Sequence, residues 1–316
     1  MATLGEIWHY TTATGLSGIL SEHVLWASSA AFMNDHRELR TGPAVLAKQL
    51  DDLHGLVDDE NFQGFLRLAR GMGTIDQTLS FVACACHERD SLTMWRNYTD
   101  EVGFAVRLDP ARPLFLRRQR SMSDVLFPSD EKLLGDVAGS AAILGLMADN
   151  FDESPREWQD AIYSKREQDS LARECLQLVR AYAKDPGQQT AEDAQTITNV
   201  MLEFNRTLQR FKDEAFKHEQ ERRVVFPVPQ PLSRCFTKFR TSKYGIVPYV
   251  ELGLPAEEPE GAGAALPRPM QNLPILQIAV GPTPYPDQAV AGVRQLLISF
   301  GYGDVDVVSS KIPFRS

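Results

Sequence analysis

The stretch IWHYTTATGLSGILSEHVLWAS at residues 7–28 predicts a strand, a helix and a second strand in close succession. Residues 7–10 favour the first strand, and Thr12 or Thr14 can cap the helix behind it. The helix shows three apolar residues at helical spacing, namely Leu16, Ile19 and Leu20. Residues 24–28 then favour a strand again. This stretch therefore predicts a fold in which helices and strands alternate over short distances along the chain.

Working outward, residues 79–86 (LSFVACAC) have the length and β-enriched content of a buried strand. Residues 103–108 (GFAVRL) are expected to be its partner. Between them we expect a short helix that carries Trp95 and Tyr98. A helical segment is also expected near residues 42–70, ahead of the buried strand.

The middle of the chain carries its strongest helical signal. Apolar residues recur there at steps of three and four: Ala194, Ile197, Val200, Met201, Phe204, Leu208 and Phe211. We therefore predict a helical insertion over about residues 130–215, packed against the sheet as one body with it.

Strand patterns return at residues 222–226 and 245–252. Residues 253–273 are rich in Pro, Gly and Ala without periodicity, which predicts a flexible exposed loop. A strand, a helix and a strand are expected to close the chain, over residues 275–280, 289–300 and 305–308.

Composition excludes several classes of protein. With 43% hydrophobic and 24% charged residues among 316, the chain has enough apolar material for a folded core. The formal net charge of −9 disfavours nonspecific coating of nucleic acid. No apolar stretch is long enough to cross a bilayer, so we expect a cytoplasmic protein without a membrane partner. The four cysteines form neither a disulfide framework nor a metal-ligand repeat, and the histidines are scattered, so no metal site is predicted.

A series of short motifs, in a fixed order, links the chain to a known family. They are His9-Tyr10-Thr11, Phe32-Met33-Asn34-Asp35 with Glu38, Asp90–Trp95 with Tyr98, Gly103-Phe104, Phe216 with Glu219, Glu221 and Arg223, Gly281-Pro282, and Ser310–Arg315. Together they resemble the bacterial family of unknown function DUF2971. Its relatives include AbiGi-like proteins associated with abortive infection of phage-infected cells.

The early His-Tyr-Thr strand and the late Glu-x-Glu strand of this family look like a divergent ADP-ribosyltransferase fold. The resemblance implies a single α+β domain over residues 1–316, with a split, mixed or antiparallel sheet and the helical insertion. In such a fold the split sheet holds nicotinamide adenine dinucleotide (NAD), the cosubstrate, in a cleft.

Cleavage of the bond between nicotinamide and ribose develops positive charge on the sugar, so the site needs a carboxylate beside the ribose. By resemblance Glu221 stabilises the oxocarbenium ion, and Glu219 positions or deprotonates the acceptor. In a strand, Glu219, Glu221 and Arg223 would face one side, where Arg223 could restrain both acids. The alternative is a solvated edge strand with a surface charge network.

His9 is expected to bind a ribose hydroxyl or the adenylate end of NAD, and the motif places Thr11 beside it. The alternative for His9 is a core histidine bonded to backbone. Tyr10 would point to the opposite face of the strand, into the core.

Tyr98 and Trp95, one turn apart, are candidates for stacking on the nicotinamide ring, and Phe32 is a third. Packing between helix and sheet is the structural alternative for these aromatics. Arg240 is expected to meet the dinucleotide phosphates, because a guanidinium binds phosphate oxygens in a bidentate manner. Asn34 and Asp35 are expected to have a structural role, because Asx side chains in a turn or at a helix start usually accept hydrogen bonds from backbone amides.

The resemblance thus predicts an NAD-consuming ADP-ribosyltransferase of phage defence or a toxin. Its acceptor is a protein or a nucleic acid, and a phage component is a possible partner. A groove that includes Arg117, Arg118 and Arg120 could admit a nucleic-acid strand. NAD hydrolysis is a related alternative, and a module that senses a nucleotide or a phage protein without turnover is an alternative of another class.

Overall fold

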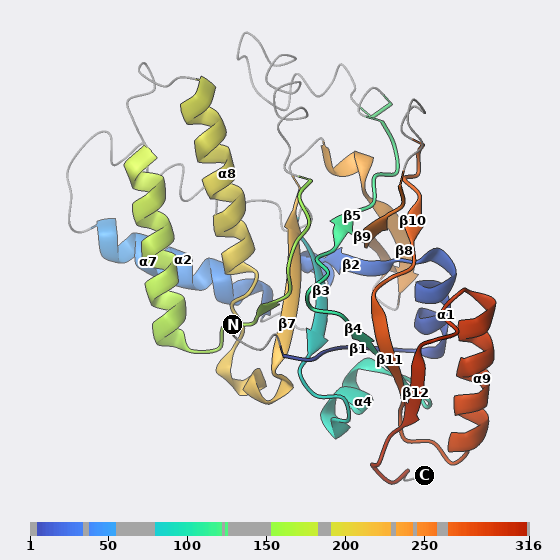
Figure 1. Ribbon diagram of the computed structural model, residues 1–316. Coiled ribbons are helices and arrows are strands. Elements are labelled where there is room, and N and C mark those ends of the chain that lie inside the picture. The colour runs from blue at the N-terminus through green and yellow to red at the C-terminus, as the bar shows by residue number, and fades with distance from the viewer. Residues whose placement is uncertain are drawn as a thin grey trace.

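The structure is a computed structural model that describes residues 5–33, 38–54, 80–121, 124–125, 153–182, 191–228, 232–242, 245–257 and 265–314. Within them the chain is an α+β protein with a mixed, open and largely antiparallel sheet (Figure 1). The strands are β1 Ile7–Thr11, β2 Leu25–Ser29, β3 Ser80–Cys86, β4 Phe104–Leu108, β5 Phe115–Leu116, β6 Gln159–Asp160, β7 Glu221–Pro227, β8 Lys238–Ser242, β9 Gly245–Pro255, β10 Met270–Gln271, β11 Ile275–Val280 and β12 Asp306–Ser309.

The helices are α1 Ala13–Glu22, α2 Glu38–His54, α4 Leu92–Tyr98, α7 Lys165–Tyr182, α8 Ala191–Leu208 and α9 Pro286–Ser299, with 3₁₀ turns η1 Ala30–Phe32, η4 Glu214–Glu219 and η5 Leu232–Cys235. Figure 1 shows α2, α7 and α8 on one side of the sheet, α1 and α9 at the other side, and α4 at one end. None of the helices within the described ranges has the length and apolar character needed to cross a membrane.

The first strand, helix and strand form as predicted. The side chain of Thr12 accepts a hydrogen bond from the Gly15 amide at 3.1 Å and so caps α1. The three apolar residues of α1 are buried against the sheet. Its C-cap, His23, takes the left-handed conformation at φ 56°, which ends the helix and turns the chain into β2.

The sheet divides at β3. One edge of this strand pairs with β7 along its whole length, from Ser80 opposite Pro227 to Cys86 opposite Glu221. The other edge is shared, since β2 pairs at Phe81 and Val82 while β1 pairs only at Cys86. In Figure 1, β1 and β2 accordingly run across the view while β3 and β7 run upright. A stretch of β3 between the two pairing points is left beside a gap in the sheet.

The predicted pairing of residues 103–108 with 79–86 is wrong. β4 pairs with β1 through five residue pairs and with β11 on its other edge, and β1 lies between β4 and β3. Strands buried on both faces carry similar apolar sequences, so composition does not reveal which of them are neighbours.

The strand, helix and strand at the C-terminal end are confirmed as β11, α9 and β12. β11 and β12 pair in parallel, as the crossover through α9 requires, with Val293 and Leu297 of the helix buried on the sheet.

The helical middle is represented by α7 and α8, which pack on each other and on α2 around Leu46, Leu176 and Phe204. α8 also contacts β7, so these helices adjoin the sheet as expected. Within the predicted insertion, residues 130–152 and 183–190 lie outside the described residues. The prediction of helix is wrong at Gln159–Asp160, which form β6, because they pair with the edge of β7.

The predicted loop over residues 253–273 is shorter than expected at both ends. β9 continues to Pro255, and Met270–Gln271 forms β10 on its edge. Two ladder pairs between β9 and β10 explain the difference, since irregular composition does not prevent backbone pairing. Residues 258–264 lie outside the described residues.

The main core lies on the face of the sheet that includes Phe81 of β3 and its cross-strand neighbour Phe226 of β7. Phe81 is 1% exposed, so Phe81→Ala should lower the free energy of unfolding by about 3–5 kcal/mol through lost burial and a residual cavity. Phe239→Ala on β8 is the matched control, because that ring is 65% exposed and its loss should cost less than about 0.5 kcal/mol. Equal losses in urea denaturation would contradict this account of the core.

Candidate functional site

A cavity of about 850 Å³ opens at the division of the sheet. Its floor is the stretch Val82–Ala85 of β3, which begins at the last residue that pairs with β2 and ends just before Cys86, the residue that pairs with β1. The walls come from β1, β2, α4, β8 and the segment that leads into β7. The residues that line it are His9, Tyr10, Trp26, Ser28, Phe32, Met33, Val82, Ala83, Cys84, Ala85, Met94, Arg96, Asn97, Tyr98, Lys212, Asp213, Ala215, Phe216, Glu219, Glu221 and Arg240.

His9 occupies the gap between β1 and β3. Its Nδ1 lies 2.8 Å from the carbonyl oxygen of Cys84, a residue to which neither β1 nor β2 pairs. A carbonyl only accepts, so Nδ1 carries the proton. Burial lowers the pKa of His9, although the Cys84 carbonyl opposes that shift, and the ring is held neutral. The neutral ring leaves Nε2 as an acceptor for a ligand hydroxyl.

Two carboxylates meet one lysine at the other wall. Lys212 Nζ lies 2.6 Å from Glu219 Oε2 and 2.5 Å from Glu221 Oε2, and all three side chains are at most 5% exposed. Arg223 grips Glu221 with Nε at 2.9 Å and Nη2 at 3.0 Å. The formal charges of these four groups cancel, so the carboxylates are buried without a net charge on the cluster.

Glu221 is ionised at neutral pH. Burial raises its pKa, but Arg223 and Lys212 outweigh that effect and bring the pKa to about 2. Its backbone amide also donates to the Tyr163 hydroxyl at 2.9 Å, which fixes the first residue of β7. The site therefore presents an ionised carboxylate in a fixed position.

The expectation that Glu219, Glu221 and Arg223 alternate along one strand is wrong for Glu219. Glu219 ends η4, and Gln220 takes the left-handed conformation at φ 45° before β7 begins. The two carboxylates nevertheless converge, because both bind Lys212. They lie in the wall of a cavity and not on a solvated edge strand.

Tyr98 connects α4 to this cluster. Its hydroxyl donates to Glu219 Oε2 at 3.1 Å, and its ring lines the cavity. Burial raises the pKa of Tyr98, so the hydroxyl remains a donor. Sequence reasoning placed Tyr98 and Trp95 together, but only Tyr98 reaches the cavity.

Trp95 holds α4 on the fold instead. It is 5% exposed and packs edge-on against Tyr10 at 4.5 Å between ring centroids. Its Nε1 donates to Asp90 at 2.8 Å, and the same carboxylate accepts from Ser310 Oγ at 2.5 Å. A Cβ on Gly281 would lie 2.9 Å from the Trp95 ring, so the glycine allows this close approach. Asp90, Trp95, Gly281 and Ser310, all from the short motifs quoted in the sequence analysis, thus hold α4 in place.

The opposite end of the cavity is formed by Trp26 and Ser28 of β2 and Arg240 of β8, with Phe32 beside them in the lining. Arg240 Nη2 donates to Ser28 Oγ at 3.0 Å. Phe32 and Arg240 were predicted as binding residues and both line the cavity, whereas Thr11 does not. Asn34 and Asp35 lie outside the described residues.

Among the lining residues that sequence reasoning missed are Lys212 and Trp26. Lys212 follows the last apolar residue of the helical stripe, and an isolated lysine carries no signal of burial. Trp26 did carry a signal of its position, since it alternates with the apolar Leu25 and Ala27 along the strand and therefore faces the opposite side of the sheet from them.

Arg117 and Arg118, two members of the predicted basic groove, are paired with carboxylates and do not form a free cationic surface. Arg117 Nη1 lies 3.1 Å from the buried Glu251, and Arg118 pairs with Glu153. These guanidinium groups already have carboxylate partners, which compete with any phosphate.

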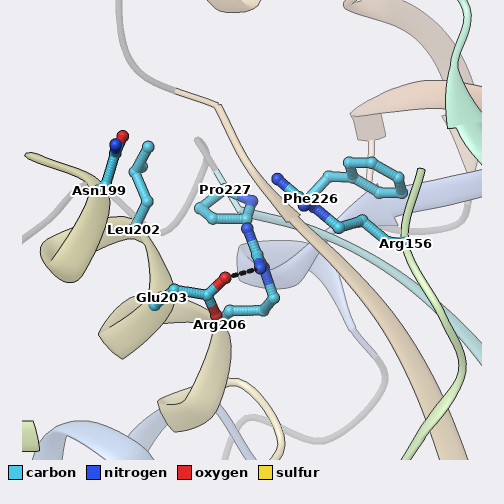
Figure 2. Close-up of a pocket in the computed structure, with 7 residues that line it drawn as sticks. All are labelled: Arg156, Asn199, Leu202, Glu203, Arg206, Phe226 and Pro227. Atoms are coloured by element: carbon cyan, nitrogen blue, oxygen red, sulfur yellow. Dashed lines mark hydrogen bonds and ion pairs between the residues drawn. The ribbon is translucent and has the colours of Figure 1, made fainter. Parts of the chain in front are cut away.

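A second cavity of about 130 Å³ lies between α8 and the end of β7. Figure 2 shows its lining, in which Glu203 and Arg206 of α8 form an ion pair beside Phe226 and Pro227. This cavity is too small for a nucleotide. Within the described ranges no group of three or more His, Cys, Asp or Glu residues could hold a metal ion.

Residues 94–224 match the model of a family described as a protein of unknown function, DUF2971, which confirms the resemblance found in the sequence. The matched region runs from α4 to the start of β7 and so contains Tyr98, Lys212, Glu219 and Glu221. Comparison with curated proteins and with solved structures found no match.

The lysine between the carboxylates should be essential for stability. Lys212→Met leaves excess negative charge in a buried cluster and should lower the free energy of unfolding by about 3–5 kcal/mol in urea denaturation. The double variant Lys212→Met, Glu221→Gln removes one charge of each sign and should lose less than the sum of the two single variants. Additive losses would show that the charges are not coupled.

His9 should make stability depend on pH. Its folded-state pKa is lowered, so the unfolded chain binds the proton first as the pH falls below about 6.5, and acid favours unfolding. His9→Gln keeps an N–H donor and should flatten the loss between pH 6.5 and 5 by up to about 1.4 kcal/mol per pH unit. Identical slopes for both proteins would contradict a neutral buried His9.

Proposed function

We propose that this DUF2971 protein is an NAD-dependent ADP-ribosyltransferase that works in the cavity at the division of its sheet. The observation that carries the proposal is the meeting of His9 from β1 and Glu221 from β7 in one cavity. Two strand spacings separate them, about 10 Å of sheet, which a ribose with its attached groups can bridge.

The reaction needs a carboxylate that stays charged as positive charge develops on the ribose. Glu221 meets that need, because its pKa of about 2 keeps it ionised and its position is fixed by Arg223. The bond from ribose C1 to the nicotinamide nitrogen breaks, and nicotinamide leaves with the electron pair. Glu221 faces the resulting oxocarbenium ion.

The remaining steps belong to the neighbouring groups. An acceptor nucleophile bonds to C1, and Glu219 takes its proton, directly or through Tyr98, whose hydroxyl already binds Glu219. His9 accepts from a ribose hydroxyl through Nε2, and Arg240 binds phosphate oxygens. The acceptor is a protein or a nucleic acid, and the AbiGi-like resemblance favours a role in phage defence or as a toxin.

A binding module without turnover is the second candidate, and one observation favours it. Lys212 and Arg223 neutralise Glu221 in the structure, which reduces the field it can exert on a cationic sugar. In that case the cavity senses a nucleotide or a phage protein.

Incubation with NAD and measurement of free nicotinamide tests the proposal. Glu221→Gln keeps the shape and removes the charge, so the rate of nicotinamide release should fall on the order of a hundredfold or more. Glu101→Gln, at an exposed position outside the cavity, is the control and should retain the wild-type rate. Thermal unfolding of both variants shows whether any loss is a loss of fold.

Wild-type protein that releases no nicotinamide would favour the binding module. Free ADP-ribose as the product, with no label transferred to protein, RNA or DNA, would identify the activity as NAD hydrolysis.

A further inference from the structure

The end of the cavity away from the carboxylates has its own chemistry. We call Trp26, Ser28 and Arg240 the Trp26–Arg240 subsite. Trp26 and Ser28 come from β2, which pairs with β9, and Arg240 reaches across β9 from β8 to bond Ser28. An aromatic ring, a hydroxyl and a guanidinium therefore meet at one point in the cavity lining.

Arg240 has unused binding capacity. Its Nε is buried and has no hydrogen-bond partner within the described residues, where its guanidinium contacts Ser28 and the Trp26 ring and forms no ion pair with a carboxylate. A buried donor without a partner is costly, and native structures usually supply one from solvent or a ligand. In a chain of net charge −9, an arginine that pairs with no carboxylate of the described residues is suited to bind an anion from outside.

Trp26 supplies an apolar surface beside that anion site. Its indole is 39% exposed although β2 is otherwise mostly buried, and it is placed in the cavity lining. Tyr249 packs against it at 4.7 Å between ring centroids, and the Arg240 guanidinium lies 6.0 Å from its centroid. An aromatic base can stack on such a group, whichever base it is.

The subsite lies far from Glu221. Ser28 pairs with Val82 of β3, and Glu221 is opposite Cys86, so four residue steps and two strand spacings separate them. Those steps amount to about 16 Å. A single nucleoside cannot contact both ends, whereas an extended dinucleotide can.

We infer that the Trp26–Arg240 subsite binds an aromatic base together with its 5′-phosphate, and so takes the adenosine phosphate half of the dinucleotide while the other half lies at Glu221. The inference rests on the proposed function for the identity of the second half. The base stacks on Trp26, and Arg240 with Ser28 binds the phosphate oxygens. This fixes the direction in which a dinucleotide enters the cavity.

Calorimetric binding of AMP tests the subsite without any turnover, since AMP lacks the scissile bond. Trp26→Ala and Arg240→Gln should each weaken AMP binding about tenfold or more. Trp26→Phe keeps a ring and should stay within about threefold of the wild type. The matched controls are Phe239→Ala, an exposed ring on β8, and Arg294→Gln, an exposed arginine on α9, and neither should change AMP binding.

The outcomes separate the subsite from the proposed function. AMP binding that is absent in the wild type, or equally strong in all variants, overturns the subsite even if the protein releases nicotinamide from NAD. If AMP binding depends on Trp26 and Arg240 but the protein releases no nicotinamide, the subsite is supported and the proposed transferase activity is contradicted. Circular dichroism spectra and melting temperatures verify that Trp26→Ala and Arg240→Gln are folded, and Trp26→Phe gives the same test with a smaller change.

Discussion

The edge of β3 that β1 and β2 share is the constraint on which the rest of the structure depends. Each of the two strands pairs at one end of that edge, so the backbone between them must find other partners. His9 supplies one by bonding the Cys84 carbonyl. The gap in the sheet becomes a cavity because β7 continues unbroken on the other edge and closes its floor. A fully paired β3 would leave no room for a ligand at this position.

Burial of charge is the second organising feature. Glu219, Glu221, Lys212 and Arg223 are each less than 6% exposed, a position that charged groups hold only when paired. Their pairing makes Glu221 rigid and ionised, and it also cancels the net charge of the cluster. The same arrangement thus fixes Glu221 as an ionised carboxylate and weakens the electric field that Glu221 exerts on a ligand. A substrate that approaches Glu221 competes with Lys212 for it.

The contacts that hold α4 in place link distant segments of the chain to the site. Asp90 accepts hydrogen bonds from both Trp95 and Ser310. Burial raises the pKa of Asp90, but these hydrogen bonds and that of the Lys311 amide bring it below its usual value. Through α4 these contacts set the place of Tyr98, which binds Glu219. Motifs at both ends of the chain therefore act on the cavity, although the Asp90, Trp95 and Ser310 side chains are not in its lining.

The sequence by itself determined the α1 unit, β3, β7, β9, the long helix α8 and the closing β11–α9–β12 unit, because periodicity, caps and chain order are local properties. It also singled out His9, Tyr98, Glu221 and Arg240, since polar residues at fixed places in strands are visible without a fold. Only the tertiary structure decided that β1 separates β3 from β4, that Lys212 joins the carboxylates, and that Trp95 is core while Trp26 is not. Those facts depend on which strands are neighbours and which way a side chain faces, and long-range pairing leaves little trace in local sequence.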